Sequence, residues 1–113
     1  TIKLDSGLQY ILVDQGSGKP PEKGNVVKIH FSGYFSNGEL FQSSLKTDDP
    51  VIFAIDKGQV IKGLNNVVKQ LKPGSRARAL IPWQLGYGRE GNPPLIPAKT
   101  DLIFDIELIS VVQ

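Results

Sequence analysis

Alternating apolar and polar residues predict a series of short β-strands along this chain. The clearest run covers residues 27–32, where Val27, Ile29 and Phe31 share one face of a strand and polar residues take the other. Runs of similar character predict further strands at residues 8–13, 39–43, 51–55, 76–81 and 102–108. Asn37-Gly38 separates two of these runs and predicts a tight hairpin turn with positive φ at both residues.

One segment repeats its apolar residues at helical spacing instead. These residues are Val60, Leu64, Val67, Val68 and Leu71. The sequence Lys72-Pro73-Gly74 ends the predicted helix after about three turns. Asn65 and Asn66 are weak helix formers, so tertiary packing must hold this helix. The whole pattern predicts an α+β domain, in which an antiparallel β-sheet of five or six strands packs on one short α-helix.

A long stretch without strand pattern precedes the last predicted strand. Residues 83–100 contain three glycines and three prolines. An irregular segment of this length within a compact domain is usually functional. We therefore expect it to contribute to a site.

Length and composition fit a single globular domain. The chain has 113 residues, 40% of them hydrophobic and 21% charged, and a formal net charge of +2. It contains no cysteine, which excludes disulfides, thiolate metal sites and a cysteine nucleophile. No apolar run reaches the roughly 18 residues that a membrane helix needs. Since the sequence starts at Thr1 and contains no methionine, we expect a longer native protein. Within it, residues 1–113 form one domain and residues 1–24 its N-terminal strand and loop extension.

Most catalytic chemistries lack their residues here. His30 is the only histidine and alternates outward from its strand, which argues against a zinc site. Residues 86–91 fit G-x-G-x-x-G, but they precede a proline-rich loop rather than a helix, so we reject a dinucleotide site. Asp48-Asp49 precedes Pro50 and favours turn capping over catalysis. The basic residues between positions 69 and 78 lack interleaved aromatic residues, which argues against nucleic-acid binding.

The remaining candidates are aromatic. They come from five separate segments and are Phe31, Phe41, Phe53, Tyr87 and Phe104. Such residues either fill the core or line an apolar pocket, and the spacing leaves both interpretations open. For Phe53, on a short buried strand, we favour the core.

A series of motifs, taken in order, resembles the FKBP-type peptidyl-prolyl cis-trans isomerases. The motifs are Ile29-His30-Phe31-Ser32-Gly33, Asn37-Gly38, Phe41-Gln42-Ser43-Ser44, Gln59-Val60-Ile61-Lys62-Gly63-Leu64, Leu85-Gly86-Tyr87-Gly88, Leu95-Ile96-Pro97 and Leu102-Ile103-Phe104-Asp105-Ile106-Glu107-Leu108. The resemblance covers nearly the whole chain from Leu8 onward. The opening Gly7-Leu8-Gln9-Tyr10 is similar to the bacterial macrophage infectivity potentiator subgroup. The resemblance implies a twisted antiparallel sheet wrapped around a short helix, with an apolar pocket between them.

The resemblance also assigns roles to individual residues. It implies that Phe31, Phe41, Tyr87 and Phe104 are the catalytic residues. The implied substrate-binding residues are Gln42, Val51, Val60, Ile61, Leu64, Leu95 and Ile96, with Leu64 as the pocket floor and Leu95 at its rim. The backbone amide of Ile61 and the phenol of Tyr87 would hydrogen-bond substrate carbonyls. No cofactor is implied, because rotation about an X-Pro bond changes no covalent bond.

The chain departs from the family pattern at three of these places and at Thr47. Leu64 stands where tryptophan is usual, Val51 where an aromatic residue is common, Gln42 where aspartate is usual and Thr47 where its arginine partner is usual. The last two changes imply that a neutral pair replaces an ion pair in a poorly solvated place beside the pocket. We expect X-Pro-containing polypeptides as partners and a reduced affinity for macrolide inhibitors. Trp83 belongs by position to the entry of the 83–100 loop rather than to the pocket.

Three functions compete at this stage. The leading one is a peptidyl-prolyl isomerase that assists protein folding, with the cell envelope or periplasm favoured over the cytoplasm. The alternative is an FKBP-like module that binds proline-containing segments with little or no turnover. A third, an oligonucleotide-binding barrel, would need exposed aromatic residues among basic ones, which we do not find.

Overall fold

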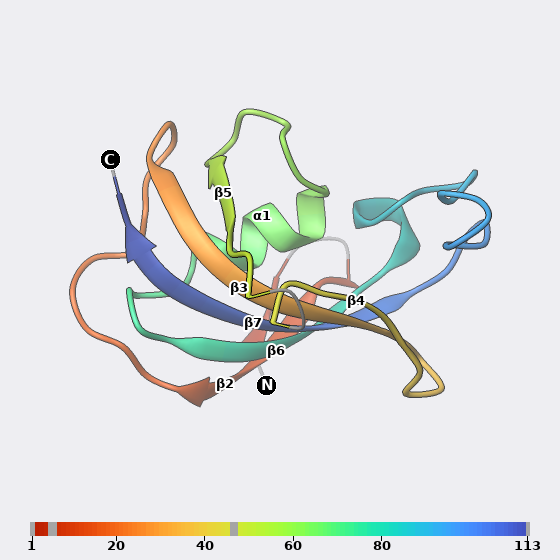
Figure 1. Cartoon of the computed structure of the whole chain (residues 1–113), viewed down its shortest axis with the longest axis horizontal. Helices are drawn as coiled ribbons and strands as arrows, with labels where there is room; N and C mark the ends of the chain where they lie inside the picture. The colour runs from red at the N-terminus through yellow and green to blue at the C-terminus, as the bar shows by residue number, and fades with distance from the viewer. Residues whose placement is uncertain (1, 5–6, 46–47, 113) are drawn as a thin grey trace.

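A curved antiparallel sheet holds the short α-helix α1 on its concave side (Figure 1). This computed structural model describes residues 2–4, 7–45 and 48–112. The strands are β1 (Ile2–Lys3), β2 (Gln9–Asp14), β3 (Val26–Phe35), β4 (Leu40–Ser43), β5 (Val51–Ala54), β6 (Arg76–Ile81) and β7 (Leu102–Val111). Helix α1 covers Lys62–Val68, and a short 3-10 turn, η2, covers Trp83–Leu85. None of the helices in these ranges has the length and apolarity needed to cross a membrane.

The sheet is organised around its two longest strands. Its order is β1-β2-β6-β7-β3-β4, and β5 also pairs with β3. Strand β3 pairs with β7 along one edge, while its other edge takes β5 at residues 26–29 and β4 at residues 32–34. The predicted α+β fold is confirmed. The sheet has seven strands where the sequence predicted five or six, because β1 has only two residues and is too short to show alternation.

The core lies between the sheet and α1. Side chains of strand β6 alternate between the core and solvent. Ala77, Ala79 and Ile81 are buried, while Arg76, Arg78 and Leu80 are exposed. The helix approaches the sheet closely at Gly63, where any Cβ atom would collide with the side chain of Ile81. A small residue on α1 is therefore needed at this crossing.

Helix α1 is shorter than predicted. It has seven residues rather than about three turns, because Ile61 before it is extended, with φ −59° and ψ 148°. At the other end, the N–H of Gln70 donates to the Val67 carbonyl oxygen at 2.9 Å, and the N–H of Leu71 to that of Val68 at 3.1 Å. These i→i+3 bonds tighten the chain into a turn ahead of Pro73. Val60 and Leu71 therefore flank the helix, although both still pack on the core.

The β3–β4 hairpin also differs from the prediction. Of its central residues only Gly38 has a positive φ, of 90°, whereas Asn37 does not. The N–H of Gly38 donates to the Phe35 carbonyl oxygen at 2.9 Å, and the N–H of Phe35 donates to that of Glu39 at 2.9 Å. The turn thus spans residues 35–38, which matches the register shift that follows Gly33 on β3.

Candidate functional site

Three of the four predicted catalytic residues form one aromatic cluster. The rings of Phe31 on β3 and Phe104 on β7 stack with centroids 5.6 Å apart. The ring of Phe41 on β4 meets Phe104 edge-on, with centroids 5.9 Å apart and the planes at 70°. Phe31 and Phe104 are 8% and 2% exposed, and Phe41 is half-buried. The cluster therefore has a buried base and an accessible edge.

A glycine on β3 makes room for this cluster. Gly33 pairs with Phe104 in the β3–β7 register. A Cβ atom on Gly33 would lie 2.6 Å from Cζ of Phe41 and within 3.1 Å of two further atoms of that ring. Such distances are far below van der Waals contact, so only glycine allows the Phe41 ring to lie against this part of the sheet.

The helix side contributes the apolar residues Val60, Ile61 and Leu64. Val60 and Ile61 precede α1 and are half-buried against the core, and Leu64 in the helix is 4% exposed. The carbonyl oxygen of Ile61 accepts the N–H of Asn65 at 3.1 Å. The N–H of Ile61, by contrast, has no hydrogen-bond partner among the described residues. This donor is therefore available to a ligand carbonyl.

The segment that carries Val60 and Ile61 is anchored by residues that the sequence analysis missed. Asn65 accepts the N–H of Asp56 on its Oδ1 at 2.9 Å, and its Nδ2 donates to Oδ1 of Asp56 at 2.7 Å. Asp56, at φ 60°, also pairs with Nζ of Lys69 at 2.9 Å. The hydrogen bond from Lys69, followed by that from Asn65, lowers the pKa of the Asp56 carboxyl below its ordinary value. The one sequence signal was a weak helix former, Asn65, at a buried helical position.

The irregular segment between β6 and β7 supplies Tyr87, Leu95 and Ile96. Tyr87 is half-buried, and burial raises the pKa of its phenol above the ordinary value. Its hydroxyl makes no hydrogen bond within the described part of the chain. Ile96 is 1% exposed and exchanges two backbone hydrogen bonds with Asn92, whereas Leu95 is 46% exposed. Ile96 thus belongs to the core, and Leu95 lies outside it.

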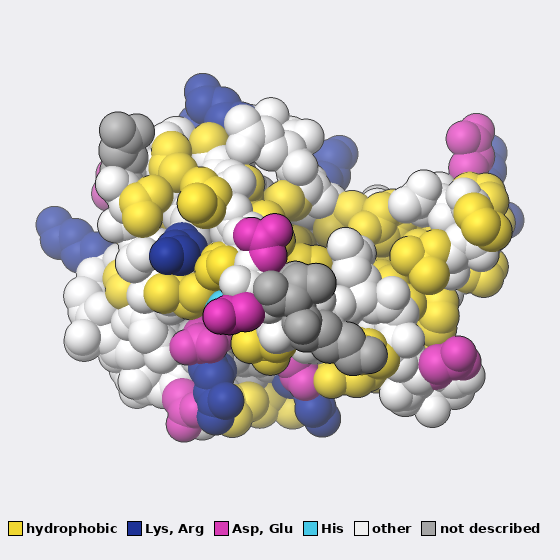
Figure 2. All heavy atoms as spheres, viewed as in Figure 1, with side chains coloured by type: hydrophobic (Ala, Val, Ile, Leu, Met, Phe, Trp, Pro, Cys, Tyr) yellow, Lys and Arg dark blue, Asp and Glu magenta, His cyan; other side chains and the backbone are white. Residues whose placement is uncertain are grey.

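The base of this loop is closed by contacts around Trp83. The N–H of Trp83 donates to Oδ1 of Asp101 at 2.9 Å. The Lys99 ammonium lies 5.8 Å from the centre of the Trp83 indole, a distance suited to a cation–π contact. In Figure 2, hydrophobic side chains line the surface where the loop leaves the body of the molecule. Trp83 lies at the loop entry, where the sequence placed it.

The remaining two predicted substrate-binding residues, Val51 and Gln42, differ in burial. Val51 on β5 is half-buried, packs on the core and pairs with Ile29. Gln42 on β4 is exposed to solvent, so the poorly solvated surroundings predicted for it were wrong. Phe41 takes the inward position of this short strand, which leaves Gln42 to face water. Thr47, the other half of the predicted neutral pair, lies outside the described residues.

A hollow in the protein surface does not coincide with the aromatic cluster. It has a volume of about 520 Å³, lies on the opposite face of the sheet, and shares only Phe31 with the predicted site. The aromatic cluster is identified by the chemistry of its side chains. It combines aromatic rings with two donors that have no hydrogen-bond partner among the described residues, the Tyr87 hydroxyl and the Ile61 N–H.

Comparisons with known proteins identify the family of this chain. The family profile described as FKBP-type peptidyl-prolyl cis-trans isomerase matches residues 17–109. FK506-binding protein 1 of Candida glabrata is 39% identical over 109 residues, which cover 96% of each chain. FK506-binding protein 4 of Dictyostelium discoideum is 44% identical over 112 residues, which are 99% of this chain but 30% of that protein. A probable FKBP-type isomerase of Haemophilus influenzae is 38% identical over 94% of this chain and 43% of its own.

Solved structures show the same fold. The crystal structure of AtFKBP13 superposes with a TM-score of 0.86 at 32% identity, covering 96% of this chain and 95% of that one. The N-terminal domain of FKBP42 from Arabidopsis thaliana gives a TM-score of 0.90 at 26% identity, covering 96% and 89%. The sequence match, the sheet around one helix and the aromatic cluster lead to the same conclusion: this chain belongs to the FKBP-type peptidyl-prolyl cis-trans isomerases.

Proposed function

We propose that this chain isomerises X-Pro bonds at the aromatic cluster, with the proline ring held against Phe31, Phe41 and Phe104. The observation that carries the proposal is the convergence of these rings at centroid distances of 5.6 and 5.9 Å. Val60, Leu64 and Ile96 complete the apolar lining in this proposal. Val51 and Leu95 contact the residues that flank the proline, and Gln42 does so from the solvent side.

The chemistry asked of such a site is modest. Rotation about an X-Pro bond crosses a barrier of roughly 18–20 kcal/mol because amide resonance must be broken. A dry pocket disfavours the planar, charge-separated amide relative to the twisted one. The Tyr87 hydroxyl and the Ile61 N–H donate hydrogen bonds to the carbonyls on either side and fix them during rotation. Each 1.36 kcal/mol of differential stabilisation gives about a tenfold rate increase, so a few such contacts suffice.

Substrates in this proposal are exposed X-Pro segments of polypeptides, and the role is assistance to protein folding. Two relatives are named as FK506-binding proteins. By analogy we propose that macrolides occupy the same site in this chain. Their affinity is reduced, because Leu64 offers less contact area at the floor than the tryptophan usual in the family.

The subgroup and the compartment are further parts of the proposal. The Gly7-Leu8-Gln9-Tyr10 opening and the 38% identical Haemophilus relative favour the bacterial macrophage infectivity potentiator type. Membership of that subgroup favours the cell envelope or periplasm. Fractionation of the native organism with an antibody against this domain tests the compartment.

A protease-coupled isomerisation assay tests the proposed activity. We expect a rate above the uncatalysed one, and a loss of most of it in a folded Phe104→Leu variant. The alternative, a module that only binds proline-containing segments, predicts saturable binding of the same peptide without rate enhancement. Binding without turnover would therefore favour that alternative over catalysis.

A further inference from the structure

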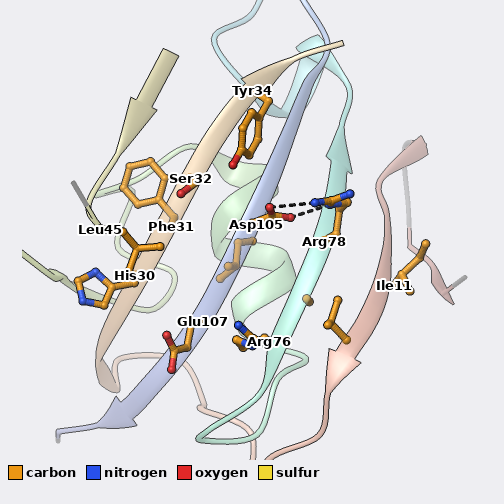
Figure 3. Close-up of a pocket in the computed structure, with 13 residues that line it drawn as sticks. Ile11, His30, Phe31, Ser32, Tyr34, Leu45, Arg76, Arg78, Asp105 and Glu107 are labelled. Carbon is orange, nitrogen blue, oxygen red and sulfur yellow. Dashed lines mark hydrogen bonds and ion pairs between the residues drawn. The ribbon is translucent and has the colours of Figure 1, made fainter. Parts of the chain in front are cut away.

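The outer face of the sheet carries a groove that the proposed activity does not use. Its volume is about 520 Å³, and it crosses strands β2, β6, β7 and β3 on the face turned away from α1 (Figure 3). Ile11 lies at one end and Leu45 at the other, and Val13, two residues along β2 from Ile11, also lines the groove. Between them lie the charged side chains Arg76, Arg78, Asp105 and Glu107.

The two arginines of the groove are already neutralised. Arg76 pairs with Asp14 at 2.6 Å, and Arg78 donates to both carboxylate oxygens of Asp105, at 2.7 and 3.1 Å. Glu107 differs from these carboxylates, because it makes no hydrogen bond or ion pair to any residue that the structure describes. In the sheet register it lies opposite Arg76 on one side and His30 on the other. Among the described residues, Glu107 is therefore the carboxylate of this groove that is left without an ion-pair partner, although the whole chain has a formal net charge of +2.

The two ends of the groove are apolar and open to solvent. Ile11, Val13 and Leu45 are 52%, 57% and 58% exposed. Pairing of β1 along the free edge of β2 reaches only Tyr10, so Ile11 and Val13 lie beyond it. These apolar side chains lose solvent-exposed area if a partner covers the groove, which favours association.

We propose that this groove binds an extended polypeptide segment in which a lysine or arginine lies between apolar residues. The basic side chain pairs with Glu107, and the apolar ones cover Leu45 at one end and Ile11 with Val13 at the other. Three inter-strand spacings separate β3 from β2, which is about 14 Å. An extended segment of about four to five residues spans this distance. The proposal does not depend on the isomerase activity, since the groove lies on the opposite face from α1 and the loop that carries Tyr87.

A proline-free peptide separates this groove from the aromatic site. We choose acetyl-Gly-Leu-Ser-Lys-Ser-Val-Gly-amide and titrate it into the ¹⁵N-labelled chain at neutral pH and low salt. Saturable amide shifts should centre on Ile11, Arg76 and Glu107. The same peptide with glutamate in place of lysine should cause no saturable shifts, because it would bring a like charge to Glu107.

Variants then test the role of the unpaired carboxylate. Glu107→Gln should weaken binding of the lysine peptide by about fivefold, as expected for an accessible ion pair. Ile11→Ser should weaken it through the lost apolar contact. Glu39→Gln, which makes the same charge change at an exposed site on the β3–β4 turn, should leave binding unchanged.

Three results would overturn the proposal. They are the absence of saturable shifts up to the solubility limit of the peptide, equal affinities of Glu107→Gln and the unmodified chain, and shifts centred on Tyr87 and Phe104. A parallel isomerisation assay keeps the two proposals apart. If the unmodified chain binds the lysine peptide but shows no isomerase activity, only the catalytic proposal is contradicted. If it shows isomerase activity but does not bind the lysine peptide, only the groove proposal is contradicted.

Discussion

Asn65 and Asp56 exchange two hydrogen bonds, of 2.9 and 2.7 Å, across the connection that leads from β5 into α1. This pair fixes both ends of the segment that carries Val60 and Ile61, two of the apolar residues of the candidate site. Its partner Lys69 adds an ion pair from the end of the helix at 2.9 Å. The position of the Ile61 N–H therefore depends on a polar network outside the apolar pocket.

Removing Asn65 should destabilise the fold and reduce turnover together. In Asn65→Ala the N–H of Asp56 loses its acceptor, which should lower the free energy of unfolding by about 1–3 kcal/mol. Urea unfolding and kcat/KM for an X-Pro peptide measure the two effects. Asn66→Ala is the matched control, because it improves helix propensity and removes only an acceptor at 3.2 Å. Equal stability losses in the two variants would contradict the role assigned to Asn65.

Acid should weaken the contribution of Asp56 selectively. Its pKa in the folded state is lowered by Lys69 and Asn65, so its stabilising effect is present above the ordinary aspartate range. That effect is lost as the pH falls through the lowered pKa. Asp56→Asn should therefore be less stable than the unmodified chain at neutral pH, with the difference shrinking as the pH falls below the ordinary aspartate range. Urea midpoints measured across this range test it, with the exposed Asp49→Asn as control. A constant difference at all pH values would argue against the effect.

Replacing Gly33 should disturb Phe41 specifically. The new Cβ atom of Gly33→Ala would lie 2.6 Å from the Phe41 ring, and such overpacking costs about 1–3 kcal/mol. A smaller side chain at position 41 should relieve the conflict, so Gly33→Ala should cost less in a Phe41→Leu background. A double-mutant cycle from urea unfolding gives this coupling free energy. Additive losses would mean that the added methyl group conflicts with something other than the Phe41 ring.

Tyr87 on the β6–β7 loop and Phe104 on β7 should respond differently to substitution. Tyr87→Phe removes one hydrogen bond, worth about 0.5–1.5 kcal/mol, and should lower kcat/KM by about two- to tenfold. The free energy of unfolding of the Tyr87→Phe variant at neutral pH should differ little from that of the unmodified chain. Phe104→Ala should cost about 3–5 kcal/mol of stability, so the conservative Phe104→Leu serves as the test of activity. Undiminished turnover in a folded Phe104→Leu variant would exclude this pocket.

Leu64 and Trp83 allow a fluorescence test of the pocket floor. Trp83 lies at the loop entry with Lys99 over its ring, so macrolide binding should change its emission little. Leu64→Trp should respond strongly and bind the macrolide more tightly, because the larger ring restores floor contacts. A large signal from the unmodified chain would place Trp83 closer to the site than its loop contacts indicate.

The strands were predictable where burial alternates along the chain. Residues 27–32, 76–81 and 102–108 have one face on the core, so their order of apolar and polar residues follows the pleat. The helix was predicted too long, because Val60 and Leu71 pack on the same core from non-helical segments. The sequence pattern records burial and cannot separate a helix from its flanking turns.

The candidate site was likewise predictable only where a sequence pattern reports it. Phe31, Phe41 and Phe104 are brought together by strand register, which the motif order of a known family encodes. The Asp56–Asn65 bonds and the collision that Gly33 avoids depend on distances between segments, which no local pattern reports. Gln42 was placed in poorly solvated surroundings, but β4 is an edge of the sheet and Phe41 takes its inward position.

The pH dependence of isomerisation tests the central claim most directly. The claimed site consists of phenylalanines, aliphatic residues, the neutral amide of Gln42, a backbone amide and Tyr87, whose phenol pKa is raised by burial above an already alkaline value. None of these groups changes charge near neutrality. NMR exchange spectroscopy on the cis and trans signals of an X-Pro peptide gives the rate constant without a coupling protease. We expect catalysed exchange whose rate constant is flat from pH about 5.5 to 8.5. A bell-shaped profile in that range, or exchange no faster than in the peptide alone, would contradict the account.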